Sequence, residues 1–269
     1  MNSSSFIDAH CHLADPKFAS DLEAVLGRSE KAGVGEWIQG GVGPEDWESQ
    51  KKIAKLRPGK IHLSYGLHPW WVANHNEGEV ITALKKLEAE LGKAQCLGEL
   101  GLDFLPRFKL KAQLQKEVFR AQLILNQNFK KPLILHVVQA HSDALAILKD
   151  FRHQPGLVHA FSEGKEVLKQ YLDLGFLISV GGAVTRRGYE KLKKSLSFIP
   201  LDRLVIETDA PDQTPEVAGF SKESRNEPCT LVSLAEVISQ LRKDTTPRAL
   251  LESSSRNLRA LLASSSWSR

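Results

Sequence analysis

Short apolar runs alternate with longer segments of helical periodicity along the whole chain. Each apolar run is followed by a polar loop and then by a segment whose apolar residues recur at helical spacing. In segment 110–126, for example, Leu114, Val118 and Leu125 fall on one face of a helix. This order of elements predicts parallel strands that are joined by crossover helices.

Eight apolar runs are candidate strands, and most of them lack the polar alternation of a half-exposed sheet, as expected for strands that are buried on both faces. The predicted strands are 6–11, 36–40, 61–66, 95–98, 133–136, 157–160, 176–180 and 204–207. Predicted helices between them include 20–32, 77–91, 110–126, 142–149, 165–174 and 189–198.

Eight strand–helix units in 269 residues fit a (β/α)₈ TIM barrel that spans residues 1–269 as a single domain. An open doubly wound sheet is the rival fold, and periodicity does not separate the two. Both folds place function at the carboxyl ends of their strands, but only the barrel gathers all these ends around one mouth. Functional side chains from the first, middle and last strands together therefore favour the barrel.

Metal-ligating side chains stand at several of these strand ends. His10 and His12 end the first run, and residues i and i+2 of a strand share a face, so the two imidazoles can hold one ion. A carboxylate flanked by glycines follows the fourth run, and histidines end the fifth and sixth. The complete candidate set is His10, His12, Glu99, His136, His159 and Asp209.

This set of nitrogen and oxygen ligands suits borderline divalent ions such as zinc or manganese. It exceeds the three protein ligands of a usual catalytic zinc centre, whereas six groups can hold two ions if one carboxylate bridges them. Two metals suit in-line displacement at phosphorus by an activated water. The residues therefore predict metal-assisted hydrolysis.

Seven short motifs, in order, resemble those of the TatD family of metal-dependent deoxyribonucleases, and of its eukaryotic TatD-domain-containing members in particular. This family belongs to the amidohydrolase-like hydrolases on TIM barrels, and the resemblance runs from about residue 6 to residue 262. The motifs are HCHL (10–13), GLHP (66–69), GELGLD (98–103), KPLILH (131–136), HAFS (159–162), ETDAP (207–211) and RNEP (225–228).

The resemblance implies two divalent ions, Zn²⁺, Mg²⁺ or Mn²⁺, and a role for each ligand. His10, His12 and Asp209 would hold one ion, His136 and His159 the other, and Glu99 would bridge them. His68 would face the substrate phosphate, and Asp209 would also accept a proton from the attacking water. The implied activity is cleavage of DNA phosphodiester bonds. A 3′-exonuclease is the first candidate and an endonuclease at abasic sites the second, and the sequence does not decide between them.

Other side chains are candidate substrate contacts. Trp70 follows the GLHP motif, where it could stack on a base or pack over the barrel mouth. Arg107 and Arg225 lie in loops expected on the catalytic side and could contact phosphates, as could Arg186 and Arg187 after the seventh predicted strand.

Three positions depart from the family pattern. Val138 replaces a common basic residue, Ala160 replaces a frequent cysteine, and Asp212 replaces an aromatic residue. None of these is an expected metal ligand, so we expect the departures to affect substrate binding and preference rather than hydrolysis.

Composition describes an ordinary globular protein and leaves the partner open. The chain has 42% hydrophobic residues, a mean hydropathy of −0.25 and a net charge of +4, which permits a polyanionic partner without requiring one. We expect no membrane helix, because no apolar run approaches about 20 residues, and no nucleotide cofactor, because neither a Walker loop nor a G-x-G-x-x-G motif is present. The sequence leaves the oligomeric state open, with a monomer favoured.

The N-terminal segment has no basic region followed by an apolar core, so we expect an intracellular protein, cytoplasmic or nuclear, rather than a secreted one. The three cysteines of the chain are far apart, which suits free thiols in a reducing compartment.

The leading hypothesis is therefore a two-metal deoxyribonuclease. A second hypothesis keeps the metal site but assigns a small amide, lactone or phosphoester substrate, and a third is a binding protein without catalysis. A basic groove beside the site would favour the nuclease, and a closed apolar pocket would favour the small substrate.

Overall fold

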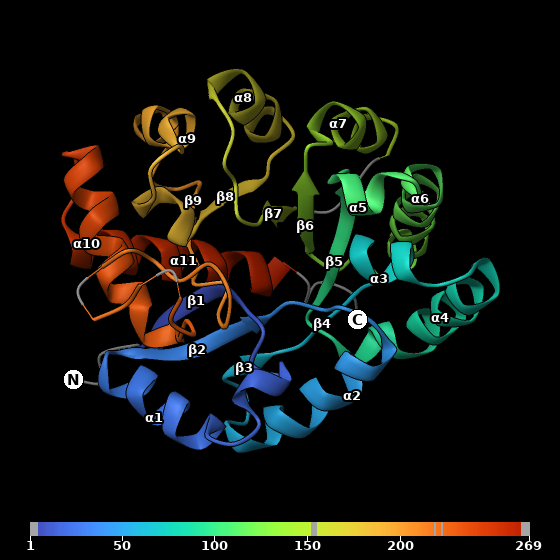
Figure 1. Cartoon of the computed structure of the whole chain (residues 1–269), viewed down its shortest axis with the longest axis horizontal. Helices are drawn as coiled ribbons and strands as arrows, with labels where there is room; N and C mark the ends of the chain where they lie inside the picture. Colours follow the sequence, from blue (N-terminus) through green and yellow to red (C-terminus); the bar gives the residue numbers. More distant parts are fainter. Residues whose placement is uncertain (1–4, 152–154, 218, 222, 265–269) are drawn as a thin grey trace.

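Among the residues that the structure describes, nine parallel strand segments form the centre of the protein (Figure 1). The computed structural model describes residues 5–151, 155–217, 219–221 and 223–264. The strands are β1 (Phe6–Cys11), β2 (Val34–Gln39), β3 (Ile61–His62), β4 (Ser64–Tyr65), β5 (Cys96–Asp103), β6 (Leu133–Val138), β7 (Gly156–Val158), β8 (Leu177–Val180) and β9 (Leu204–Ile206).

The strands follow one another around a ring in the order of the sequence. One sheet has the order β1-β2-β3, the other has the order β4-β5-β6-β7-β8-β9, and only Leu63 separates β3 from β4. The last strand meets the first through loop hydrogen bonds: Asp209 N–H donates to His10 O at 2.9 Å, and His12 N–H donates to Ala210 O at 2.7 Å. The fold is thus the predicted (β/α)₈ barrel type, and a doubly wound sheet, whose strand order reverses, does not fit.

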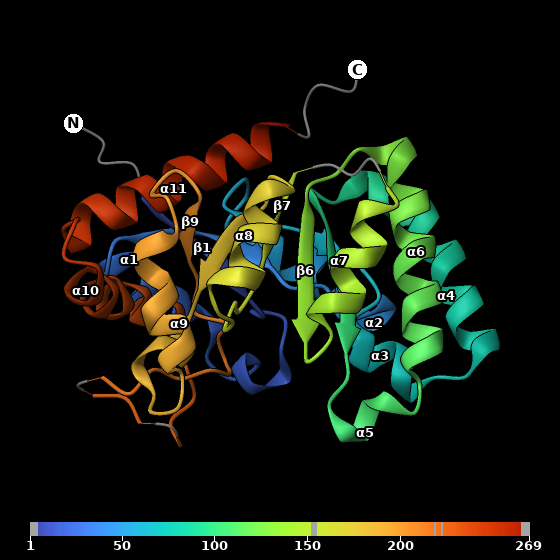
Figure 2. The same ribbon diagram turned by 90° about the horizontal axis from the view of Figure 1, so that it is seen from above.

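Helices surround the ring (Figures 1 and 2). They are α1 (Leu22–Lys31), α2 (Pro44–Ile53), α3 (Pro69–Asn74), α4 (Glu77–Glu90), α5 (Pro106–Lys109), α6 (Ala112–Phe129), α7 (His141–Lys149), α8 (Lys165–Asp173), α9 (Glu190–Ser195), α10 (Leu231–Arg242) and α11 (Pro247–Ser264). Among the helices that the structure describes, none has both the length and the apolar character needed to cross a membrane.

Apolar side chains form two separate buried clusters. The larger one lies between the strands and the surrounding helices and contains residues such as Trp37, Trp47 and Phe119. The smaller one combines strand residues such as Ile7 with Leu258 of α11. Buried apolar surface is the main stabilising contribution to such a fold, so α11 is part of the core.

Helix α11 also completes the hydrogen bonding of two strands. It lies across the end of the barrel where the strands begin (Figure 2). The Ser255 hydroxyl accepts the Ile7 N–H of β1 at 3.0 Å, and the Ser254 hydroxyl accepts the Ile206 N–H of β9 at 3.0 Å. Both serines are buried, so these hydroxyls satisfy backbone donors that water does not reach.

Two buried glutamines of α6 hold loops at the opposite end of the barrel. The Gln122 amide bonds both the N–H and the carbonyl of Leu67, at 2.9 and 3.2 Å. The Gln115 amide bonds the N–H and the carbonyl of Asp103 in the same way, at 2.8 and 3.0 Å. Since each amide offers a donor and an acceptor, one side chain satisfies both backbone polar groups of one residue.

Two strands extend further at their carboxyl ends than predicted. β5 continues to Asp103, so Glu99 lies within the strand instead of at its end, and β6 continues two residues past His136. The pairing of β5 with β6 shifts register between Gly98 and Leu100, at Glu99. Such an irregularity redirects a side chain within a strand, which an apolar run in the sequence does not reveal.

We predict that Ser255→Ala destabilises the protein. The substitution leaves the buried Ile7 N–H without its acceptor, which costs about 1–3 kcal/mol in the free energy of unfolding. The melting temperature should fall by about 2–4 °C per kcal/mol in a chain of this size, as measured by thermal denaturation. Ser49→Ala is the control, because the Ser49 hydroxyl bonds only its own helix at the surface; equal melting temperatures for the two variants would contradict the assignment.

Candidate metal centre

The six candidate ligands converge at one end of the barrel, although they come from five strands or the loops that follow them. Three overlapping groups of side chains can hold a metal ion, and within each group the ligand atoms lie within 4.8 Å of one another. The groups are His10 with His12 and Glu99, His10 with His159 and Asp209, and His68 with Glu99 and His136.

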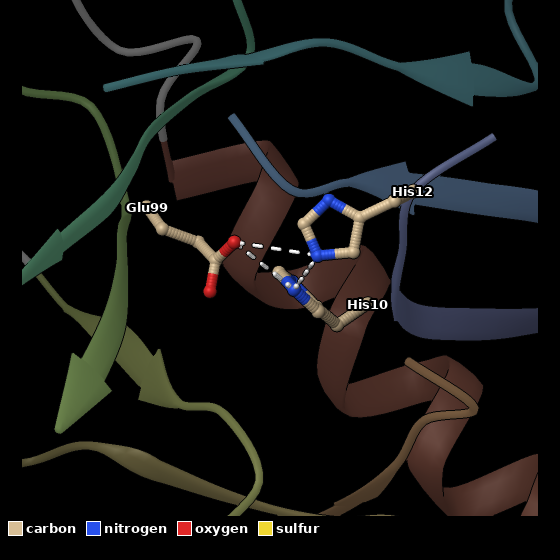
Figure 3. A group of neighbouring side chains, drawn as sticks. All are labelled: His10, His12 and Glu99. Carbon is tan, nitrogen blue, oxygen red and sulfur yellow. Dashed lines mark hydrogen bonds and ion pairs between the residues drawn. The ribbon is translucent and has the colours of Figure 1, made fainter. Parts of the chain in front are cut away.

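One carboxylate oxygen of Glu99 faces the two histidines of the first strand (Figure 3). Glu99 Oε1 lies 3.5 Å from His10 Nε2 and 3.4 Å from His12 Nε2, and the two Nε2 atoms are 3.3 Å apart. Asp209 Oδ1 lies 3.6 and 3.4 Å from the same two nitrogens. These four atoms therefore surround one point.

The other oxygen of Glu99 faces a second pair of histidines. Glu99 Oε2 lies 3.2 Å from His159 Nε2 and 3.4 Å from His136 Nδ1, and these nitrogens are 3.1 Å apart. The two oxygens of one carboxylate are thus divided between two groups of ligand atoms. That arrangement is the one expected of a bridging carboxylate.

Two further carboxylates fix the orientation of the second pair. Glu207 Oε1 lies 3.2 Å from His159 Nδ1, and Asp103 Oδ2 lies 3.3 Å from His136 Nε2. A carboxylate accepts the ring N–H, so the opposite nitrogen carries the lone pair. In their neutral forms, the form that binds metal, His159 Nε2 and His136 Nδ1 therefore both direct electron pairs toward Glu99.

The nitrogen lone pairs and the buried carboxylate of Glu99 repel one another, so positive charge is needed between them. Both oxygens of Glu99 are buried without a hydrogen-bond donor among the described residues, and the side chain is 1% exposed. An unpaired buried charge is costly, and nitrogen and carboxylate ligands at this spacing fit a divalent ion such as zinc. The donor set therefore fits metal ions on both sides of Glu99.

The pKa values of two histidines show that the carboxylates create a negative potential at the centre. Burial lowers the pKa of His159, but Glu207 and Glu99 outweigh burial and raise it to about 10. Burial likewise lowers the pKa of His12, and Asp209 together with Glu99 raises it to about 9. The site attracts positive charge, which metal ions supply without a proton.

His68 lies beside the centre in a different state. As the residue that caps α3, it accepts the Trp70 N–H at Nδ1 at 3.0 Å, so its neutral form carries the proton on Nε2. That nitrogen lies 3.7 Å from Glu99 Oε2. Burial holds the pKa of His68 well below its usual value. His68 is therefore a neutral donor at the centre.

Three residues that support the centre were not predicted. Glu207 and Asp103 lie within motifs of the sequence, but they were not assigned roles there. Gln213 Nε2 donates to Asp209 Oδ2 at 2.7 Å, which leaves Oδ1 facing the histidines. Glu207 and Asp103 could have been found in the sequence, because each is a second carboxylate in a motif that contains a ligand. Nothing in the sequence marks Gln213.

Trp70 belongs to the wall of the centre. Its indole N–H donates to Asp103, and its ring stacks on Phe108 with centroids 5.7 Å apart. The ring is nevertheless 37% exposed. The Arg107 guanidinium lies 5.6 Å from the Trp70 ring centroid and 4.6 Å from that of Phe108. Trp70 thus packs against the wall and is also partly exposed to solvent. Contact of Trp70 and Arg107 with substrate stays a prediction.

Arg225 is already engaged in ion pairs. Its two terminal nitrogens donate to both oxygens of Asp21 at 2.7 Å, to Glu227 at 2.9 Å and to the Lys17 carbonyl at 2.7 Å. These bonds occupy the outer donors of the guanidinium. The predicted phosphate contact by Arg225 would require some of them to break.

A cavity of about 360 Å³ adjoins the centre on the side of Asp209. Gln213, the hydrogen-bond partner of Asp209, is one of its lining residues. Its other lining residues include Lys17, Arg186, Asp212, Thr214 and Arg225.

Comparison with known families and curated proteins gives consistent matches over nearly the whole chain. The family model described as TatD related DNase matches residues 7–263. The uncharacterized metal-dependent hydrolase YjjV of Escherichia coli K12 is 32% identical over 246 residues, which cover 89% of this chain and 91% of YjjV. The 3′-5′ ssDNA/RNA exonuclease TatD of Erwinia billingiae is 34% identical over 259 residues, which cover 94% of this chain and 97% of that protein.

Solved structures give the same result. The crystal structure of YjjV, a TatD homologue from Escherichia coli K12, superposes with a TM-score of 0.85 and 29% identity, covering 95% of this chain and 97% of that one. A TatD family hydrolase from Entamoeba histolytica gives a TM-score of 0.81 at 23% identity, covering 96% and 98%, which shows the shared fold.

We predict that Glu207→Gln weakens the binding of divalent metal about 10–100-fold, because a neutral amide oxygen accepts the His159 N–H more weakly than the carboxylate does and makes the ring a poorer ligand. Zinc affinity is measured by competition with a chromophoric chelator. The surface substitution Glu88→Gln on α4 changes the charge equally and should leave affinity unchanged. If Glu207→Gln binds zinc as tightly as Glu88→Gln, the orienting role of Glu207 is wrong.

Proposed function

The chain belongs to the family of TatD-related DNases and is a metal-dependent hydrolase, and on this basis we propose that it cleaves phosphodiester bonds in DNA with two divalent ions. The observation that carries the proposal is the division of the Glu99 oxygens between two groups of ligand atoms. A single-ion centre would not need both oxygens of a buried carboxylate to face different histidine pairs.

The geometry suggests which residues hold each ion. His10, His12 and Asp209 would hold the first ion, His136 and His159 the second, and Glu99 both. Zinc, manganese and magnesium are the candidates, and the histidine content favours the first two. At such a centre, divalent ions supply an activated water and neutralise negative charge on phosphate oxygens.

The protein's own side chains account for the remaining steps. His68 presents a neutral Nε2–H at the centre, where it can donate to a phosphate oxygen. Burial raises the pKa of Asp209, but its bond with His12 and the charges of His159 and His10 hold it well below the usual value. Asp209 therefore stays ionised at neutral pH, and it can accept the proton that the attacking water releases.

Nucleic acid is the substrate that the surroundings favour. The cavity beside the centre is lined by Arg186, which forms no ion pair with a carboxylate of the described residues, and such a guanidinium suits a phosphate of a nucleic-acid chain. A small amide or lactone would instead need an enclosed apolar pocket. The named activity of the Erwinia billingiae relative, removal of nucleotides from the 3′ end of single-stranded DNA or RNA, supports a 3′-exonuclease. Cleavage at abasic sites is a further activity to test.

We predict that Glu99→Gln lowers phosphodiester hydrolysis by more than about 100-fold, which is more than the loss of an outer orienting residue costs. Asp209→Asn should have a similar effect, because it removes both a ligand and a proton acceptor. The assay is release of nucleotides from a labelled single-stranded oligonucleotide, after chelation and after addition of Mg²⁺, Mn²⁺ or Zn²⁺ to the purified protein.

Glu88→Gln serves as the control here as well and should retain full activity. Unchanged hydrolysis by both site variants, or full activity in the presence of a chelator, would contradict the proposed function. Circular dichroism of each variant separates loss of activity from loss of fold.

A further inference from the structure

We propose that Arg186 and the cavity beside the metal centre form a binding site for a second phosphate of the substrate strand, next to the one that is cleaved. This inference rests on the proposed nuclease function and specifies how the strand is held. The ligand class is a phosphate group of a polynucleotide, and the strand's neighbouring phosphodiester is the source that we propose.

The position of the cavity connects it to the cleavage site. Gln213 lines the cavity and donates to Asp209, so the same side chain borders both sites. Pro211 and Asp212, which follow Asp209 directly in the chain, also line the cavity. A strand whose scissile phosphate lies at Glu99 and Asp209 would therefore extend into or past this cavity.

Most charges around the cavity already have a partner. Lys17 Nζ pairs with Asp212 at 2.7 Å, and Arg225 pairs with Asp21 and Glu227. Glu223 accepts the hydroxyl of Ser221 at 2.9 Å. The charges of Lys17 and Arg225 are therefore largely cancelled by their carboxylate partners and leave little positive charge for a ligand.

Arg186 differs from the other basic residues of the cavity. One of its terminal nitrogens donates to the Thr214 carbonyl at 3.0 Å, and its Nε is buried without a hydrogen-bond partner among the described residues. No carboxylate in the part of the chain that the structure describes forms an ion pair with it. A half-buried guanidinium with unused donors attracts an anion, and phosphate matches its planar fork.

The loop that carries Arg186 is fixed against the loop that carries Gln213. A Cβ atom at Gly182 would lie 1.8 Å from the Gln213 carbonyl, so the two backbones approach as closely as only glycine allows. The Thr185 hydroxyl accepts the Glu216 N–H at 2.9 Å and donates to the Gly182 carbonyl at 2.7 Å. Arg186 is therefore held in place before substrate arrives, which reduces the entropy lost on binding.

The test compares thymidine oligonucleotides that differ by one phosphate. A dinucleotide without terminal phosphates has one phosphodiester, which must occupy the metal centre, whereas a trinucleotide has a second one for the cavity. We expect Arg186→Gln to lower kcat/KM for the trinucleotide about tenfold, as for the loss of one charge-assisted contact, and to leave the dinucleotide unchanged. Dinucleotides with a 5′ or 3′ terminal phosphate show whether a phosphate monoester can replace the second diester.

Arg256→Gln is the matched control, because Arg256 is exposed on α11, at the end of the barrel opposite the metal centre, and carries the same charge. It should leave both substrates unchanged, and Arg186→Lys should keep part of the trinucleotide preference. Equal kinetics for Arg186→Gln and Arg256→Gln, or an equal loss on both substrates, would overturn the phosphate site. Unchanged cleavage of the dinucleotide also shows that the variant is folded.

A binding measurement separates this inference from the nuclease function. With a fluorescent single-stranded oligonucleotide and a chelator present, the slope of log affinity against log salt should fall in magnitude by about 0.7 in Arg186→Gln, as for one lost phosphate contact. An unchanged slope would overturn the site. If the wild-type protein cleaves neither oligonucleotide, the nuclease function fails, and the salt slope alone then decides whether Arg186 binds phosphate.

Discussion

The burial of Glu99 is the constraint on which the rest of the site depends. Its carboxylate is 1% exposed, both oxygens lack donors among the described residues, and four histidine nitrogens lie within about 3.5 Å of it. An isolated buried charge of this kind would destabilise the fold. A centre that gathers divalent cations removes this cost, so one carboxylate links the stability of the barrel mouth to metal binding and to the proposed chemistry.

The surrounding structure keeps the ligands aimed at this carboxylate. Glu207 and Asp103 hold the outer nitrogens of two histidines, and Gln213 holds the outer oxygen of Asp209. Gln115 in turn bonds both the backbone N–H and the carbonyl of Asp103 from a helix outside the barrel. Three of the six ligands, His136, His159 and Asp209, are therefore positioned by a polar partner, an arrangement that holds catalytic geometry without rearrangement on binding.

The sequence predicted the barrel and brought together the right strand ends, because parallel strands and their order follow from apolar runs and helical periodicity. The alternation of strand side chains also explains why His10 and His12 were predicted to act together. The place of Glu99 within β5 was missed, because a register shift is set by pairing with β6. Gln213 and Glu207 were missed because their partners are determined by tertiary contacts, and the serines of α11 lay in a segment with no apparent motif.

The number and position of the bound ions test this account most directly. Crystals of the wild-type protein grown with Mn²⁺ should show two peaks of anomalous scattering about 3.5–4 Å apart, one on each side of the Glu99 carboxylate. One peak should lie among His10, His12 and Asp209, and the other beside His136 and His159. A single ion that contacts only one oxygen of Glu99, or ions bound away from it at saturating metal, would contradict the two-metal centre.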